Sequence, residues 1–382
     1  MQICNVKVIG LNGAKDLCIE QDIIKTVTPV NTNANGNRLI FDEAIAFPGL
    51  INSHDHLDFN LFPELGNRIY NNYIEWAHDI HTNNKDVIDQ VLKIPLKLRV
   101  AWGVYKNLLT GVTTVVNHGH PLTIEEDLIH VFQQYYYLHS VHFEKKWLLS
   151  INNPRKRDHP YVIHIGEGTD AASTKEIDRF IKWNVFKKDI IGVHGVSMTE
   201  RQAAHFAALV WCPASNYFLL NKTADINQLK NKTKIVFGTD STLTAGWNIW
   251  EHLRLAQKEG ITDQALFDML TTIPASVWQL KGRGMIANGY EADIVIAKKL
   301  PGREGLDAFF AINPEDILLV MHKGNIRLFD DSLYNQLKSG GYAMDKFSKI
   351  NFQQSSKYVE GNLPALMEAV KGYCPGVSFP VA

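Results

Sequence analysis

The sequence predicts an α/β fold, in which a (β/α)8 TIM-type barrel carries a small discontinuous β-sandwich domain. Three observations lead to this prediction. Apolar runs typical of strands alternate with longer helical stretches over 47–283, which is the pattern of βα units and a parallel sheet. Strand-like patterns return on both flanks, at 1–46 and 284–382. The chain has 382 residues, so a barrel of about 250 residues leaves room for one smaller domain.

The two flanks are predicted to pair into one β module. On the first flank, short apolar runs are separated by Gly13 and by an Asn-rich turn at 31–37. On the second flank, a strand at 293–297 precedes a hairpin at 317–329, whose turn is Lys323-Gly324-Asn325. The tail at 330–382 is predicted to be helical and irregular.

Eight runs are predicted as barrel strands. They are 49–53, 113–117, 135–143, 147–151, 161–165, 190–193, 208–211 and 234–237. Helical segments are expected between them, at 73–81, 87–109, 175–186, 199–206 and 249–258. In a closed barrel the carboxyl ends of all eight strands meet at one mouth, where the functional residues are expected.

Composition favours a globular protein with a small-molecule partner. The 39 Lys and Arg nearly balance the 40 Asp and Glu, which argues against a nucleic acid or an anionic membrane as partner. The four cysteines are scattered and show no disulfide or metal-knuckle spacing. The start of the chain lacks a secretory signal pattern, and no apolar run reaches about 18 residues. We therefore expect a cytoplasmic protein; a homo-oligomer is compatible with the sequence.

Histidines and one aspartate recur at the ends of predicted strands. His54 and His56 follow the first strand, and residues two apart in an extended segment point to the same side. Taken alone, this pair is more often two solvated or core-edge histidines than a metal site. However, His164, His194 and Asp240 end three further strands, so a barrel would bring all five to one mouth.

Five motifs occur in a fixed order through this region. They are PGLINSHDH at 48–56, HIGEG at 164–168, GVHG at 192–195, CPASN at 212–216 and GTDS at 238–241, followed by PASVWQLKGRGMIANGYEADIVI at 274–296. With these motifs the sequence resembles the amidohydrolase superfamily over about 45–300. The resemblance is to its branch of mononuclear deaminases and chlorohydrolases, which includes cytosine deaminase and S-adenosylhomocysteine/methylthioadenosine deaminase.

The resemblance implies a metal site. It makes His54, His56, His164 and Asp240 the ligands of one divalent ion, Zn²⁺ or Fe²⁺, which suits three imidazoles and a carboxylate. Such an ion lowers the pKa of bound water from near 16 to roughly 7 and so provides hydroxide. The alternative for Asp240 is a helix cap.

Two further residues receive catalytic roles from the resemblance. Glu167 would take a proton from water and return it to the substrate nitrogen, and His194 would contact the water or the developing oxyanion. The alternatives are a helix-capping glutamate and a core histidine.

A second metal is not expected. Two-metal members of the superfamily add a lysine at the end of the fourth strand, but Lys145 and Lys146 precede the predicted strand at 147–151. The H-x-E and P-C-x-x-C deaminase pattern is also missing, because no second cysteine lies near Cys212.

Three residues are predicted to contact substrate: His118, His120 and Trp76. The first two follow the second strand, and Trp76 is placed on the next helix. Polar loop positions and ordinary packing are their alternatives. Ser215 and Asn216 are expected to shape a loop, and Cys212 to be buried filler.

The predicted activity is hydrolytic deamination of an amino-substituted heterocycle by metal-bound hydroxide. Hydrolysis of a cyclic amide or a C–Cl bond is the closest alternative, because the same residues would serve both reactions. A non-catalytic scaffold is the alternative from another class. The few long insertions within 47–283 favour a compact substrate.

Overall fold

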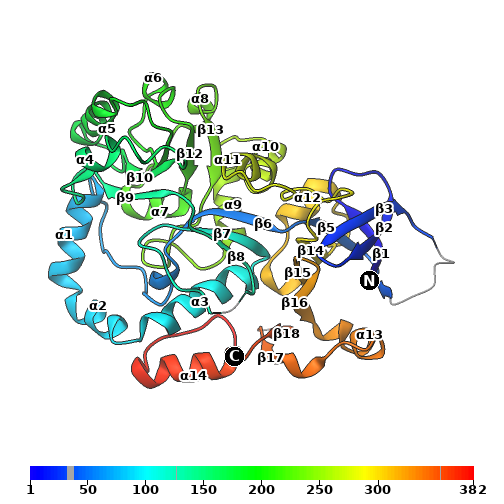
Figure 1. Cartoon of the computed structure of the whole chain (residues 1–382). Helices are drawn as coiled ribbons and strands as arrows, with labels where there is room; N and C mark the ends of the chain where they lie inside the picture. Colours follow the sequence, from blue (N-terminus) through cyan, green and yellow to red (C-terminus); the bar gives the residue numbers. More distant parts are fainter. Residues whose placement is uncertain (32–37, 126, 353) are drawn as a thin grey trace.

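The structure is a computed structural model that describes residues 1–31, 38–125, 127–352 and 354–382. The predicted Asn-rich turn therefore lies, apart from Asn31, outside the described residues. The described residues form a mixed α/β fold with three sheets. Figure 1 shows the parallel strands with their helices on one side and the largest sheet on the other.

Two of the three sheets are parallel and contain eight strands. The three-stranded sheet is formed by β6 (Leu50–Asp55), β7 (Val112–Asn117) and β8 (His130–Phe132). The five-stranded sheet is formed by β9 (Tyr136–Ser140), β10 (Tyr161–Ile165), β11 (Ile190–His194), β12 (Ala208–Trp211) and β13 (Lys234–Phe237). The alternation of parallel strands with helices is confirmed.

The strand predicted at 147–151 is wrong, because this segment is the helix α4 (Trp147–Ile151). Trp147 and Ile151 are buried while Leu148 and Leu149 are exposed, so burial follows the period of a helix rather than the alternation of a strand. The strand missed by the prediction is β8, which has only three residues and one buried side chain.

The helices lie mostly where they are predicted. The single helix expected at 87–109 is two helices, because Pro95 lacks an N–H group and disfavours a helical conformation in the preceding residue. The helices of this region are α1 (Tyr73–Asn83), α2 (Lys85–Leu92), α3 (Leu96–Leu109), α5 (Ala171–Trp183), α6 (Glu200–Ala203), α7 (Pro213–Leu220), α8 (Ile226–Leu229), α9 (Ile249–Gln257), α10 (Asp263–Asp268) and α11 (Thr272–Val277).

The third sheet joins the two flanks of the chain. Its central pair is β5 (Ala44–Pro48) against β14 (Ile294–Lys298), which run antiparallel, so the expected pairing of the flanks is observed. The first flank adds β1 (Gln2–Val8), β2 (Ala14–Glu20), β3 (Ile23–Pro29) and β4 (Arg38–Ile40). The second adds β15 (Ile317–His322) and β16 (Asn325–Asp330), which form the predicted hairpin, and β17 (Phe347–Asn351) and β18 (Ser356–Glu360).

The tail is more regular than predicted. Besides α13 (Tyr334–Ser339) and α14 (Leu363–Tyr373) it contains β17 and β18, which extend the third sheet through β16. The helix α12 (Gly305–Phe310) lies before the hairpin. In the described residues no helix combines the length and the apolar character needed to cross a bilayer.

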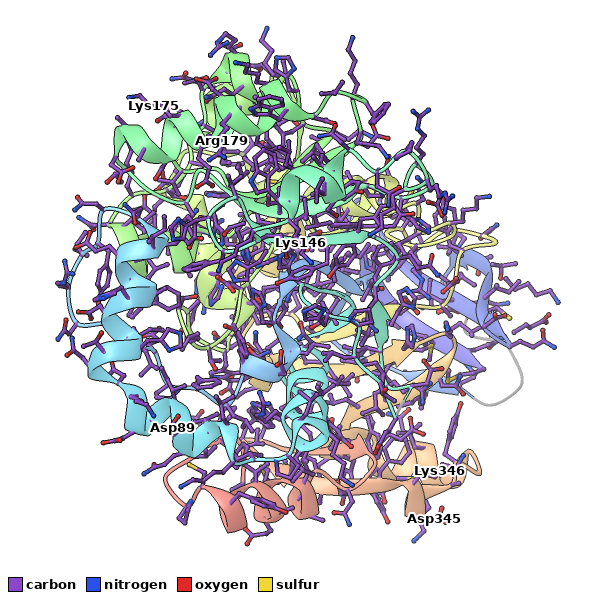
Figure 2. All side chains as sticks on the ribbon, turned by 60° about the vertical axis from the view of Figure 1, so that its left-hand side comes forward. Asp89, Lys146, Lys175, Arg179, Asp345 and Lys346 are labelled. Atoms are coloured by element: carbon purple, nitrogen blue, oxygen red, sulfur yellow. The ribbon has the colours of Figure 1, made fainter. Side chains whose placement is uncertain are left out.

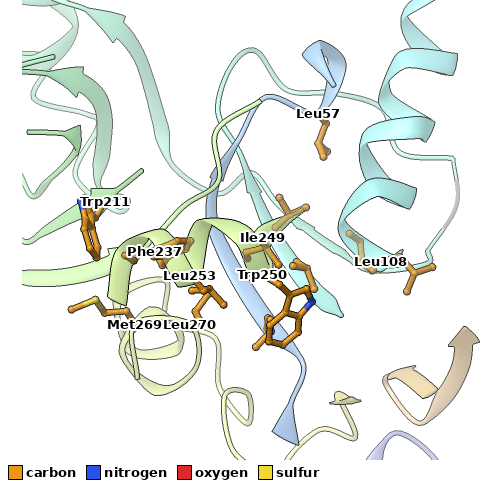
Figure 3. Close-up of a cluster of buried hydrophobic side chains, with 14 of the residues drawn as sticks. Leu57, Leu108, Trp211, Phe237, Ile249, Trp250, Leu253, Met269 and Leu270 are labelled. Atoms are coloured by element: carbon orange, nitrogen blue, oxygen red, sulfur yellow. The ribbon is translucent and has the colours of Figure 1, made fainter. Parts of the chain in front are cut away.

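A large apolar core supports the parallel strands. Figure 3 shows Trp211 and Phe237 from neighbouring strands near Ile249, Trp250 and Leu253 of α9. These five side chains are at most 1% exposed. Burial at roughly 25 cal/mol per Å² of apolar surface makes such packing the main stabilising contribution.

We predict that Leu253→Ala lowers the free energy of unfolding by about 2–5 kcal/mol, because the side chain is fully buried and its removal leaves a cavity. Urea denaturation measures the change. Leu149→Ala is the matched control, since Leu149 is 74% exposed and should change stability by less than about 0.5 kcal/mol. Equal effects in the two variants would contradict this assignment of the core.

Candidate functional site

The carboxyl ends of the parallel strands bring four potential metal ligands together. His54 and His56 come from the end of β6, His164 from β10 and Asp240 from the loop after β13. The Nε2 atoms of His54 and His164 are 3.2 Å apart. Oδ1 of Asp240 is 3.7 Å from Nε2 of both His54 and His56. The four side chains that the sequence predicts as ligands thus lie close together, in two overlapping groups that could hold a metal ion: His54, His56 and His164, and His54, Asp240 and His194.

Local backbone geometry supports this convergence. His194 and Asp240 have positive φ values of 72° and 59°, a region that costs energy for residues with a side chain and that is often retained at functional sites. Gly238 allows β13 to approach β6, because a Cβ atom there would lie 2.7 Å from Cβ of His54. The backbone conformation at the strand ends and the close approach of β13 to β6 thus bring these side chains to one point.

The electrostatics of the site suit a bound cation. Burial lowers the pKa of His54 and His164 well below the ordinary value, and neighbouring histidines lower it further. Both imidazoles are therefore neutral at pH 7 and offer lone pairs. Four donors about 2.0–2.1 Å from a tetrahedral ion lie roughly 3.3–3.4 Å from one another, close to the distances observed here. The donor set fits Zn²⁺ or Fe²⁺.

Hydroxyl groups orient the Asp240 carboxylate. Ser215 Oγ and Thr244 Oγ1 donate to Oδ2 at 2.8 and 3.1 Å, and the backbone N–H of Ser241 donates to Oδ1 at 2.8 Å. Burial alone raises the pKa of Asp240, but His56, His194 and these hydrogen bonds outweigh it and leave the pKa below its ordinary value. Ser215, expected only to shape a loop, thus contacts a predicted ligand.

Glu167 and His194 lie beside the ligand cluster. Oε2 of Glu167 is 3.6 Å from Nε2 of His194, and both residues are buried. Burial raises the pKa of Glu167 from 4.5 to about 7, although His194 lowers it. A carboxyl group with this pKa can both accept and donate a proton near neutral pH.

The second ring nitrogen of His194 is held by Asn216. Nδ1 lies 2.9 Å from Asn216 Oδ1, while Asn216 Nδ2 donates to Thr223 Oγ1 at 3.1 Å. Because an amide oxygen only accepts, Nδ1 carries the proton, and in the neutral ring Nε2 is an acceptor that faces the site. Asn216 therefore sets the tautomer of His194, a role that the sequence motif alone did not indicate.

A buried ion pair lies directly behind the ligands. Lys106 of α3 donates to Asp55 Oδ2 at 3.1 Å and to the backbone carbonyl of Asp240 at 3.3 Å. Asp55 lies between His54 and His56 in the sequence, and Asn107 Nδ2 donates to it at 2.8 Å. Lys106 is 1% exposed. No motif in the sequence points to this lysine, although its position within the apolar run of α3 is a signal of burial.

The site opens into a cavity of about 720 Å³. His56, Glu167, His194 and Asp240 lie at one end, and Trp76 is part of the wall. The size is within the range of small-molecule sites and larger than the expected compact substrate requires. Burial raises the pKa of the Cys212 thiol well above its ordinary value, which agrees with its prediction as inert filler.

Two of the predicted substrate contacts are not among the residues that line this cavity. His118 is buried against the ring of His164, at a centroid distance of 4.3 Å, and is not among the cavity-lining residues. His120 is exposed and packs near the ring of Tyr137. The spacing of His118 and His120 in the sequence does not indicate whether their side chains face the cavity, so the direction of these side chains could not be predicted.

Comparisons with known proteins identify the family and the fold. Residues 139–327 match the amidohydrolase family, so the chain carries an amidohydrolase family domain, as the sequence predicts. No curated protein matches the sequence. An adenosine deaminase from Xanthomonas campestris with bound zinc has a TM-score of 0.71 at 14% identity, over 98% of this chain and 99% of that one.

Two further solved structures share the fold. An atrazine chlorohydrolase from Arthrobacter aurescens complexed with zinc has a TM-score of 0.67 at 16% identity and covers 89% of this chain and 99% of its own. An aminofutalosine deaminase from Helicobacter pylori, in complex with methylthio-coformycin, has a TM-score of 0.63 at 12% identity, over 85% of this chain and 99% of its own.

We predict that Lys106→Met lowers the free energy of unfolding by about 3–5 kcal/mol, because it leaves the Asp55 carboxylate buried without its cation. Urea denaturation measures the loss. Lys97→Met, on an exposed position of the same helix, should change stability by less than about 0.5 kcal/mol. Similar values for the two variants would show that the pair does not support the site.

Glu176 of α5 should make stability depend on pH. Burial raises its pKa from 4.5 to about 7, with Tyr73 donating a hydrogen bond to it at 3.3 Å. The folded state binds this proton more tightly than the unfolded chain does. The stabilisation is therefore full below about pH 4.5 and lost as the pH rises through about 7.

We predict that Glu176→Gln weakens the decline of the unfolding free energy between pH 4.5 and 7, measured by urea denaturation at a series of pH values. Glu167 keeps a decline of the same sign, because its pKa is raised to about 7 as well. Glu368→Gln is the control, since that side chain is 77% exposed. A decline as steep as in the parent protein would contradict the prediction.

Proposed function

We propose, on the premise that this chain carries an amidohydrolase family domain, that it is a metal-dependent hydrolase of C–N bonds that deaminates an amino-substituted heterocycle. One observation carries the proposal. The imidazoles of His54, His56 and His164 and the Asp240 carboxylate converge at the end of a cavity, next to a carboxyl group whose pKa is near neutrality. A catalytic proton carrier works best at such a pKa.

We assign the four converging side chains as the ligands of a single Zn²⁺ or Fe²⁺ ion. When bound, such an ion lowers the pKa of a water molecule towards about 7 and polarises the substrate. A single ion agrees with the end of β9, where the sequence Ser140-Val141-His142 holds no lysine. In the zinc-bound adenosine deaminase and atrazine chlorohydrolase the same fold is associated with zinc.

Glu167 and His194 act on the nucleophile and on the leaving group. Glu167 accepts a proton as water adds to the ring carbon and returns it to the amino nitrogen, which leaves as ammonia. His194 presents Nε2 to the same space, 3.6 Å from Glu167, and contacts the water or the developing oxyanion. The hydrogen bond from Nδ1 to Asn216 keeps the ring in the orientation that this contact needs.

We further propose the domain organisation that the sequence predicts. Residues 47–283 form a (β/α)8 barrel, and 1–46 with 284–382 form a small discontinuous β-sandwich domain. Hydrogen bonds from the backbone N–H groups of Thr239 and Asp240 to the carbonyl of His54 support closure, because they join the end of β13 to β6. A barrel accounts for the meeting of distant strand ends at one mouth.

The leaving group distinguishes deamination from its closest alternative. Deamination and C–Cl hydrolysis both fit the site, because the residues recognise an electrophilic carbon and the surrounding loops select the substituent. The purified, metal-loaded protein should therefore be tested on aminopurines, aminopyrimidines, pterins and triazines, together with their chloro analogues. Stoichiometric release of ammonia supports deamination, and release of chloride alone supports the alternative.

We predict that Glu167→Gln lowers kcat by about 10²–10⁴-fold while the bound metal is retained, because the residue carries protons without being a ligand. His164→Ala should lose both activity and metal. Elemental analysis alongside the release assay measures both quantities and identifies the ion. A parent protein with neither metal nor hydrolysis would favour the scaffold alternative.

A further inference from the structure

The cavity continues beyond the ligand cluster into an apolar lobe between α1 and α2. We call this region the α1–α2 lobe and define it by Ile74, Ala77, Ile80, Ile88 and Leu92, all of which line the cavity. The three residues of α1 are spaced by three, so they lie on one face of that helix. α1 and α2 are adjacent at the edge of the molecule in Figure 1.

The α1–α2 lobe extends along most of α1. The cavity follows α1 from Tyr73 to Thr82, nine residue steps, which at a rise of 1.5 Å per residue is about 14 Å. Its outer end reaches solvent, because Leu92 is 48% exposed and Thr82 is also exposed. A heterocycle at the ligand cluster would leave this lobe unfilled unless the ring carried a substituent.

The lining of the cavity disfavours an anionic substituent. None of the described residues that line it is a lysine or an arginine, and its two acids, Glu167 and Asp240, lie at the ligand cluster. His78 and His81 of α1 also line the cavity, so a phosphate or carboxylate in the lobe would meet imidazoles rather than a permanent cation, and the loss of its hydration would be only partly offset. Figure 2 shows Asp89 of α2 at the surface, where it pairs with Lys85, and shows Lys175 and Arg179 on α5.

Aromatic side chains line the cavity between the ligand cluster and the lobe. Phe59 stacks on His56 with a centroid distance of 5.5 Å and an interplanar angle of 19°, and Phe62 packs edge-on against Phe59. Trp76 is held by a hydrogen bond of 2.7 Å from Nε1 to the carbonyl of Leu65. These rings add to the apolar lining of the cavity.

We infer that the substrate is an amino-heterocycle carrying an uncharged alkyl substituent, which lies in the α1–α2 lobe while the ring reacts at the ligand cluster. The reaction of the ring at the ligand cluster rests on the proposed function, whereas binding of the substituent in the lobe is inferred independently from the lining of the cavity. Each methylene buried there should strengthen binding by roughly three- to fourfold, from about 0.8 kcal/mol per CH₂. Selectivity thus comes from the length and charge of the substituent.

The test uses N-alkyl diaminotriazines with methyl, butyl and octyl chains, and a 4-carboxybutyl analogue, on the zinc-loaded full-length protein. Calorimetry gives the dissociation constants with Glu167→Gln, in which turnover is suppressed, and ammonia release is followed in the parent. We expect binding to tighten by roughly fiftyfold from methyl to butyl and the carboxylate to abolish this gain. Equal affinity across the series, or strong binding of the carboxylate, would overturn the inference.

Matched variants locate the effect. Leu92→Asp should weaken octyl binding at least tenfold and leave methyl binding unchanged, whereas Leu96→Asp should change neither, since Leu96 is also 48% exposed but does not line the cavity. Ala77→Lys should reverse the preference and favour the carboxylate. Equal responses of Leu92→Asp and Leu96→Asp would contradict the position of the substituent.

Different results would contradict the two proposals. If binding depends on the length of the alkyl chain but neither ammonia nor chloride is released, the proposed function is contradicted and the assignment of the lobe stands. If ammonia is released at a rate that does not depend on the alkyl chain, and the affinity is uniform, the assignment of the lobe is contradicted and the proposed function stands.

Discussion

The structure depends on one electrostatic constraint, the packing of several polar donors into a small buried volume at the strand ends. The nitrogens of His54 and His164 lie 3.2 Å apart, and the Asp240 carboxylate is 3.7 Å from two histidines. Lone pairs so close together repel one another and have lost their hydration, so the arrangement is favourable only with a shared cation or proton. The positive φ values of His194 and Asp240 are part of the cost of bringing these groups together.

A second layer of polar groups holds the ligands and links them to distant parts of the chain. The ion pair between Lys106 and Asp55 ties α3 to β6, and Asn60 donates to the same aspartate at 2.8 Å. The carbonyl of Asn60 accepts from the indole of Trp102, whose ring packs against Phe379 of the tail at 4.7 Å. The tail, for which the sequence indicates no chemistry, therefore supports the loop that follows the first two predicted ligands.

Burial has opposite effects on the two kinds of titratable group, and both effects suit hydrolysis. It lowers the pKa of His54 and His164, which keeps their lone pairs available, and raises the pKa of Glu167 to about 7. The same low-dielectric environment thus keeps the predicted ligands His54 and His164 neutral and gives Glu167 a pKa suited to proton transfer. The cavity that holds these groups at one end is also lined by the apolar residues of the α1–α2 lobe, where we infer that the substituent binds.

The sequence by itself indicated seven of the eight parallel strands, the resemblance to the amidohydrolases and the cluster of His54, His56, His164 and Asp240, because apolar periodicity and short motifs are local properties. Only the tertiary structure decided where side chains point. It made 147–151 a helix, placed His118 and His120 outside the cavity lining, and brought Ser215, Asn216 and Lys106 to the site. It also opened the lobe between α1 and α2. These features depend on contacts between residues far apart in the chain, which no local pattern records.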